Sequence, residues 1–219
     1  MNKTLAKYEP WLESCLRKHY PELETPLVAA INAYDTIKEQ NRLDAALLAP
    51  IVAAASSSRR PLYENATDLL GALTDRYPLA CSSVEHMSTD RQSQVRFNAL
   101  LCLTTSTPVE FTLRLLRQGL QDKSASVRTK AADWALRLRR HDLAPDLATA
   151  FAVETNVKAK QTIEFALGLL RDGHLLKSNP DGSSNVTTFC ANGTVSRWIA
   201  SAEFEQRGIE AIVAEMSSR

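Results

Sequence analysis

The residue types that most often do chemistry are spread along this chain without the spacing that a metal or reactive site needs. The histidines lie in separate segments with no second ligand at helical or hairpin spacing: His19, His86, His141 and His174. A metal ion needs three or four converging ligands. The sequence also contains no Gly-x-Ser-x-Gly elbow, no glycine-rich phosphate loop and no His-Glu-x-x-His helix. We therefore expect no catalytic residue, no metal, no cofactor and no small-molecule substrate.

Basic side chains gather in the middle of the sequence and indicate binding. Residues 114–140 carry eight of them against Asp122 and Asp133, a local charge of +6. They are Arg114, Arg117, Lys123, Arg128, Lys130, Arg137, Arg139 and Arg140. Such a cluster fits an acidic partner, either a protein surface or a phosphate backbone. The alternative is a solvated helix face, whose terminal cations complement the helix dipole.

An aspartate followed on the next helix by an arginine occurs twice at the same spacing, as Asp90 with Arg96 and as Asp122 with Arg128. An aspartate just before a helix can accept hydrogen bonds from the first turn, and the arginine can reach a neighbouring carboxylate or carbonyl. The other interpretation is that the two pairs form a row of charged residues that binds a ligand. We favour the first, in which the pairs are structural contacts between neighbouring units.

The composition is that of a folded protein. The 219 residues are 44% hydrophobic and 23% charged, which excludes wholesale disorder, and the net charge of +1 gives no overall polyelectrolyte character. No run approaches the roughly 18 apolar residues of a membrane span. The opening segment, MNKTLAKYEPWLESC, lacks the apolar core of a secretory signal. These features predict a cytoplasmic protein with free cysteines and no membrane contact.

Helices must position most of these side chains. Thr107-Pro108-Val109-Glu110 has the spacing of a capping box, and Ser124 and Asn156 are candidate N-caps. The pattern predicts helices over residues 10–19, 25–40, 43–55, 61–77, 79–87, 91–106, 108–121, 124–140, 142–154 and 156–171. After Gly173, β-branched residues flanking Asn192-Gly193 predict a β-hairpin over 186–199, with Leu175-Leu176 as a candidate third strand. A helix is expected over 201–216.

An internal repeat organises the helical region. The segment 90–99 recurs as 122–131, with Asp, Val, Arg and Ala at the same spacing in both copies. A weaker copy at 162–167 matches 131–136, and Asn65-Ala66 matches Asn98-Ala99 at nearly the same interval.

These motifs resemble the HEAT type of helical repeat, in which an aspartate ends the turn after the first helix and Val-Arg opens the second. Residues 113–136 look like one full unit and 84–104 like a shorter one, so the resemblance covers about 79–171. It implies a mostly α fold, a right-handed α-solenoid of HEAT-like helix pairs over residues 1–172. A small β-hairpin plus helix over 173–219 would cap the last repeat. The period is shorter than in most HEAT repeats.

The resemblance also implies a binding face, because the second helix of each pair lines the concave side of such an array. That face would carry the partner-binding residues Phe97, Leu101, Lys130, Asp133, Trp134, Arg137, Arg139 and Arg140. Trp134 either fills a gap between helices or anchors a partner. The leading hypothesis is a non-catalytic protein-protein interaction module (an adaptor, a regulator or an immunity-type inhibitor) for a partner with an acidic surface. Nucleic-acid binding through 114–140 is the alternative, and an enzyme on a HEAT-like scaffold is the third.

Overall fold

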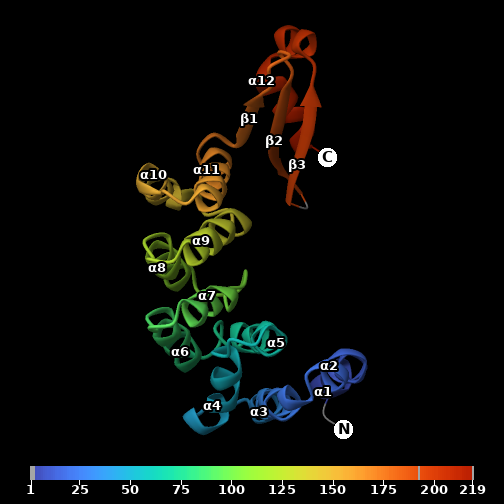
Figure 1. Cartoon of the computed structure of the whole chain (residues 1–219), viewed down its shortest axis with the longest axis vertical. Helices are drawn as coiled ribbons and strands as arrows, with labels where there is room; N and C mark the ends of the chain where they lie inside the picture. Colours follow the sequence, from blue (N-terminus) through green and yellow to red (C-terminus); the bar gives the residue numbers. More distant parts are fainter. Residues whose placement is uncertain (1–2, 192, 219) are drawn as a thin grey trace. The chain divides into compact units, whose positions relative to one another are not determined.

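The computed structural model describes residues 3–191 and 193–218, and it is mostly helical with one small antiparallel sheet (Figure 1). The chain forms two compact units, Met1–Gly119 and Leu120–Arg219. The predicted boundary between residues 172 and 173 coincides with the change from helix to strand, and as a domain boundary it stays a prediction. Among the described residues, no helix is both long and apolar enough to cross a membrane.

The described elements of the first unit are all helices. In chain order they are α1 (Lys3–Trp11), a π-helical segment (Leu12–Leu16), α2 (Arg17–His19), a 3-10 turn (Pro21–Leu23), α3 (Glu24–Gln40), α4 (Ala45–Ala55), α5 (Arg60–Gly71), α6 (Pro78–Ser88), α7 (Ser93–Leu101) and α8 (Val109–Leu120), whose last residue falls in the second unit. Most of the predicted helices are confirmed. The helix predicted over 61–77 is too long, because α5 ends at Gly71 and Pro78 begins the next helix.

The second unit combines helices with the sheet. Its elements are α9 (Ala125–Arg137), a 3-10 turn (His141–Leu143), α10 (Ala144–Val153), α11 (Val157–Asp172), β1 (His174–Ser178), β2 (Ser184–Cys190), β3 (Gly193–Ile199) and α12 (Ser201–Ser217). The predicted hairpin and third strand are confirmed. The predicted final helix is confirmed in its bounds but not in its continuity, because Gly208 adopts a non-helical conformation with φ of 73° and kinks α12. Asn192, on which the predicted turn partly depends, lies outside the described residues.

One loop geometry recurs before four helices. The helices α5, α7, α9 and α11 begin at Arg60, Ser93, Ala125 and Val157, so their starts are almost evenly spaced along the chain. Three residues before the start of each helix, a side-chain oxygen accepts a hydrogen bond from the backbone N–H of the residue two positions later. The acceptors are Ser57 (3.0 Å), Asp90 (2.7 Å), Asp122 (2.7 Å) and Glu154 (2.8 Å). The structural period therefore extends beyond the two clear sequence copies on both sides.

The capping predictions have mixed outcomes. The Asn156 side chain accepts the N–H of Ala159 at 3.0 Å, as predicted. Ser124 occupies the N-cap position of α9, but its hydroxyl contacts the hydroxyl of Ser126. The predicted capping box at Thr107 is wrong, because this hydroxyl accepts the N–H of Thr104 at 3.0 Å and contacts the hydroxyl of Thr74, and no hydrogen bond joins it to the described backbone of Glu110.

Small and polar residues set how closely the helices of the first unit approach. The buried Asn98 side chain on α7 donates to the carbonyls of Ala55 (2.8 Å) and Ser57 (2.9 Å), which satisfies the end of α4. At Gly71, the last residue of α5, an added Cβ would lie 2.5 Å from the Cys102 carbonyl oxygen. The packing of α5 on the end of α7 therefore requires a residue without a side chain.

The sheet has the order β1-β2-β3 with antiparallel pairing throughout. The helix α12 covers one face and forms a core with it from Val186, Ile199, Ile212 and Met216 (Figure 1). Leu175 of β1 packs against Gly168 of α11, where an added Cβ would come within 2.7 Å of the leucine. The sheet is therefore held both by its own helix and by α11.

The contact at Gly71 gives a direct test of the fold. We expect Gly71→Ala to lower the free energy of unfolding by about 1–3 kcal/mol, because backbone must move to admit the methyl group. The exposed neighbour Ala72 provides the control, as Ala72→Ser. Urea unfolding of both variants checks this. Equal midpoints for Gly71→Ala and the wild type would show that α5 and α7 do not approach as described.

Candidate functional site

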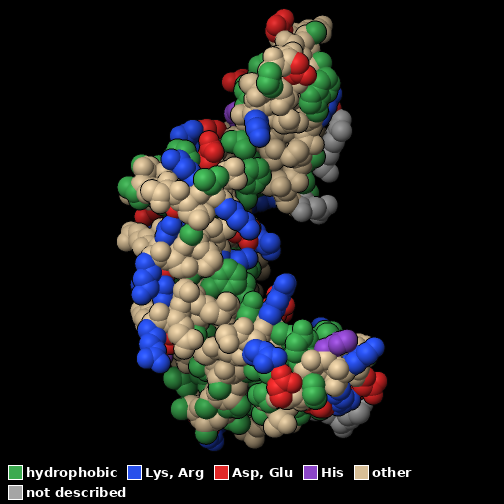
Figure 2. Space-filling view, viewed as in Figure 1, with side chains coloured by type: hydrophobic (Ala, Val, Ile, Leu, Met, Phe, Trp, Pro, Cys, Tyr) green, Lys and Arg blue, Asp and Glu red, His purple; other side chains and the backbone are tan. Residues whose placement is uncertain are grey.

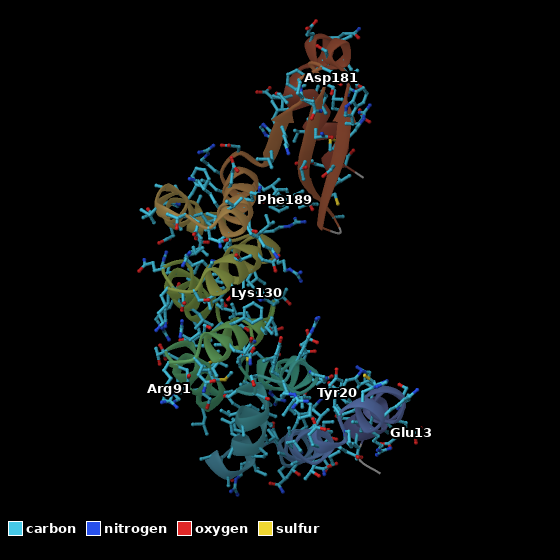
Figure 3. The ribbon with its side chains drawn as sticks, viewed as in Figure 1. Glu13, Tyr20, Arg91, Lys130, Asp181 and Phe189 are labelled. Atoms are coloured by element: carbon cyan, nitrogen blue, oxygen red, sulfur yellow. The ribbon has the colours of Figure 1, made fainter. Side chains whose placement is uncertain are left out.

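Four of the predicted partner-binding residues form a connected group on α9. The carboxylate of Asp133 lies 3.2 Å from Lys130 Nζ and 3.2 Å from Arg137 Nε. The Arg137 guanidinium carbon lies 5.7 Å from the centre of the Trp134 ring. We call Lys130, Asp133, Trp134 and Arg137 the α9 patch; Lys130 is labelled in Figure 3.

The orientation of Trp134 is unusual for a residue that only fills space. The side chain is half-buried, and its indole nitrogen is fully buried with no hydrogen-bond acceptor among the described residues. An unpaired buried N–H costs about 1–3 kcal/mol. Because the N–H edge points inward, the accessible part of the ring is carbon. The ring therefore offers an apolar surface beside the exposed Arg137.

The remaining two arginines of the predicted cluster have structural partners outside the patch. The helix α9 ends at Arg137, and Arg139 adopts a left-handed backbone conformation with φ of 50°. Its guanidinium donates to the Cys190 carbonyl (2.5 Å) and lies 5.1 Å from the Phe189 ring centre. Arg140 makes a two-point ion pair with Asp142 at 2.6 and 3.1 Å. The end of the helix thus separates residues that are adjacent in sequence.

Phe97 and Leu101 lie on α7 in the first compact unit, and both are half-buried. The structure therefore brings together four of the eight predicted partner-binding residues, and places the other four in α7 and in the turn after α9.

Internal ion pairs neutralise much of the basic region. At least five of the eight cations in residues 114–140 have a carboxylate partner among the described residues: Arg114, Arg128, Lys130, Arg137 and Arg140. Three of these carboxylates, Glu85, Glu154 and Asp142, lie outside residues 114–140. Including them about halves the local charge of +6. Figure 2 shows acidic and basic side chains side by side over α9.

The two aspartate–arginine pairs have the same geometry. Arg96 Nη1 donates to the carbonyl of Asp90 at 2.8 Å, and Arg128 Nη1 donates to the carbonyl of Asp122 at 2.7 Å. Both arginines thus hold the loop that precedes their own helix. The sequence interpretation named carbonyls as possible acceptors, and these contacts agree with it.

Arg128 has a second partner, a carboxylate near the start of α11; the sequence interpretation allowed a neighbouring carboxylate but did not identify Glu154. Its guanidinium makes a two-point contact with Glu154, at 2.5 and 2.7 Å, and the Glu154 side chain is 1% exposed. Hydrogen bonds from Arg128 lower the pKa of Glu154 to about 2. This pair lies in a depression of about 540 Å³ beside α10. Because the carboxylate is paired, the depression offers no free charge at this point.

Breaking this pair has a predictable effect on stability. Arg128→Met leaves a buried carboxylate without its cation, so we expect a loss of about 3–5 kcal/mol at pH 7. Arg171→Met, which removes the cation of the exposed pair with Asp172, is the control and is expected to change stability far less, because solvent screens an exposed ion pair. Similar losses in the two variants on urea unfolding would contradict the structural role of the pair.

The pH dependence provides a second readout. The folded-state pKa of Glu154 lies below the ordinary 4.5, so its contribution is complete above pH 4.5 and is lost as the pH falls towards 2. We expect the wild type to lose more stability across this window than Arg128→Met does. Parallel curves for the two proteins would contradict this assignment.

The described residues contain no group of three or more histidine, cysteine, aspartate or glutamate side chains arranged to hold a metal ion. The cysteines are all free thiols: Cys15, Cys81, Cys102 and Cys190. Burial raises the pKa of the Cys81 and Cys102 thiols, which disfavours the reactive thiolate at both positions.

Comparison with known proteins adds no assignment. No protein-family model matches the chain, and no curated protein or solved structure matches it either.

Proposed function

We propose that this chain is a non-catalytic binding protein whose α9 patch anchors a protein partner. The observation that carries the proposal is the partly exposed Trp134 ring with Arg137 on its face and its N–H edge turned inward. Tryptophan and arginine are enriched among the residues that dominate protein–protein binding energies. Arg137 keeps 63% of its side chain exposed, so the pair is accessible.

The charges of the patch favour an acidic surface on the partner. Lys130 and Arg137 both contact the carboxylate of Asp133, so the patch as a whole carries one net positive charge beside the apolar ring. A partner carboxylate next to an apolar side chain matches this combination. Nucleic-acid binding through residues 114–140 is less favoured, because phosphate recognition depends on available cations and at least five of the eight are already paired.

We also propose that the helix pairs are HEAT-like repeats. The recurrence of one loop hydrogen bond before α5, α7, α9 and α11 supports this, as does the even spacing of the four helix starts. In this proposal α9 is the second helix of its pair, and residues 173–219 cover the last pair. The protein would then act in the cytoplasm as an adaptor, a regulator or an immunity-type inhibitor.

A substitution at Trp134 separates packing from recognition. Trp134→Phe removes the unpaired N–H and keeps an aromatic ring, so we expect the free energy of unfolding to stay within about 1 kcal/mol of the wild type. Trp134→Ala removes the ring and is expected to cost about 3–5 kcal/mol. Urea unfolding measures both. A large loss in Trp134→Phe would show that the indole N–H has a structural partner.

Affinity capture tests the binding role. The tagged full chain, the patch variants Trp134→Phe and Arg137→Glu, and the control Trp198→Phe are incubated with native lysate at low salt, with and without nuclease. We expect one stoichiometric protein that survives nuclease and is retained by the control. It is expected to be lost from Arg137→Glu and reduced with Trp134→Phe, whose smaller ring offers less apolar surface. Retention by Arg137→Glu would exclude the patch. Capture of nucleic acid alone, released by salt, would support the alternative.

A further inference from the structure

A second depression, of about 400 Å³, lies in the first unit between the opening helices and α5. Trp11 and Tyr20 contribute aromatic rings to it, and α5 contributes Arg60, Glu64 and Asp68. Tyr20 is labelled in Figure 3, where it lies between α2 and α5. None of these residues belongs to the α9 patch or to the candidate residues identified from sequence.

The local backbone explains how these side chains meet. Arg60, Glu64 and Asp68 recur at successive i, i+4 positions on α5, so they line one face of the helix. On the other side, the π-helical segment Leu12–Leu16 begins directly after Trp11. Pro10, which lacks an N–H, precedes it in the last turn of α1. π-helical turns frequently occur at functional sites.

The charges of this depression do not cancel. Arg60 Nε contacts Glu64 Oε1 at 2.8 Å, which pairs these two residues with each other. No described residue donates a hydrogen bond to the Asp68 carboxylate, and none forms an ion pair with it. One negative charge is therefore left without a partner beside the two aromatic rings. Burial, together with the charge of Glu64, raises the pKa of Asp68.

The same part of the chain already shows how such a combination binds a cation. The Arg59 guanidinium carbon lies 5.8 Å from the centre of the Tyr20 ring, and Arg59 Nη2 contacts Glu22 at 2.7 Å. An aromatic ring and a carboxylate thus hold a guanidinium together at the edge of the depression. Trp11 and Asp68 also line the depression and provide a second ring and a second carboxylate there, and no described residue places a cation on either.

We propose that the depression between α1, α2 and α5 binds an organic cation, a guanidinium or alkylammonium group, against Trp11 and Asp68. Tryptophan provides the strongest cation–π surface among the side chains, and the unpaired carboxylate supplies the opposite charge. The cation comes either from a basic side chain of a peptide or from a free small molecule. Both sources present the same chemistry to the site.

Fluorescence of Trp11 gives a direct readout. In the full chain with Trp134→Phe and Trp198→Phe, Trp11 is the one remaining tryptophan. N-acetylarginine amide is titrated against this protein, with N-acetylcitrulline amide as a neutral probe of nearly the same shape. We expect a saturable change in emission with the arginine probe and at least tenfold weaker binding of the citrulline probe. Equal binding of the two probes, or no saturation, would overturn the proposal.

Variants locate the site. Asp68→Asn is expected to weaken binding of the arginine probe at least tenfold. Asp75→Asn, which changes an exposed carboxylate outside the depression, is the control and is expected to leave binding unchanged. Urea unfolding confirms that both variants are folded. Should Asp68→Asn fail to fold, Trp11→Leu, measured by calorimetry, tests the same site. Undiminished binding by a folded Asp68→Asn or Trp11→Leu would overturn the proposal.

The source of the cation is resolved by two further ligands. Ala-Arg-Ala with blocked ends represents a peptide side chain, and choline represents a free alkylammonium. Tighter binding of the tripeptide than of N-acetylarginine amide identifies a basic peptide as the ligand class. Tighter binding of choline identifies a small alkylammonium compound, and both results support a cation site.

Discussion

The helical part of this protein depends on one hydrogen bond that recurs before α5, α7, α9 and α11. A side-chain oxygen accepts a hydrogen bond from the backbone N–H two residues later. This hydrogen bond fixes the turn and sets the direction in which the next helix starts. In two of the copies an arginine in the following helix also donates to the loop. The loop geometry is therefore fixed by local contacts, before any packing between helices is considered.

The sequence predicted the positions of most elements because proline, glycine and helical periodicity are local signals. It detected the loop of the repeat only where the acceptor was aspartate, at Asp90 and Asp122, and it matched the flanking copies only through residues 65–66 and 162–167 inside the helices. Ser57 and Glu154 perform the same task with a different side chain, so residue identity did not reveal them. The end of α5 at Gly71 was missed, and so was the close approach of the Cys102 carbonyl to this glycine, which joins residues distant in sequence.

The candidate site was predicted less completely than the fold. Counting charges along residues 114–140 could not reveal that Glu85 and Glu154, both distant in sequence, neutralise Arg114 and Arg128. The count also treated Arg137 and Arg139 as one cluster, although the helix ends between them. The depression lined by Trp11 and Asp68 gave no sequence signal, because it arises where a π-helical segment meets α5.

The left-handed residue Arg139 has a consequence for how α9 is connected to the sheet. Its backbone turns the chain out of α9, and its side chain donates a hydrogen bond to the carbonyl of Cys190 at the end of β2. Arg137, close by in the chain, lies in the α9 patch. Leu138 is the one residue between Arg137 and Arg139, so the α9 patch and the end of β2 are joined by three consecutive residues and one side-chain hydrogen bond.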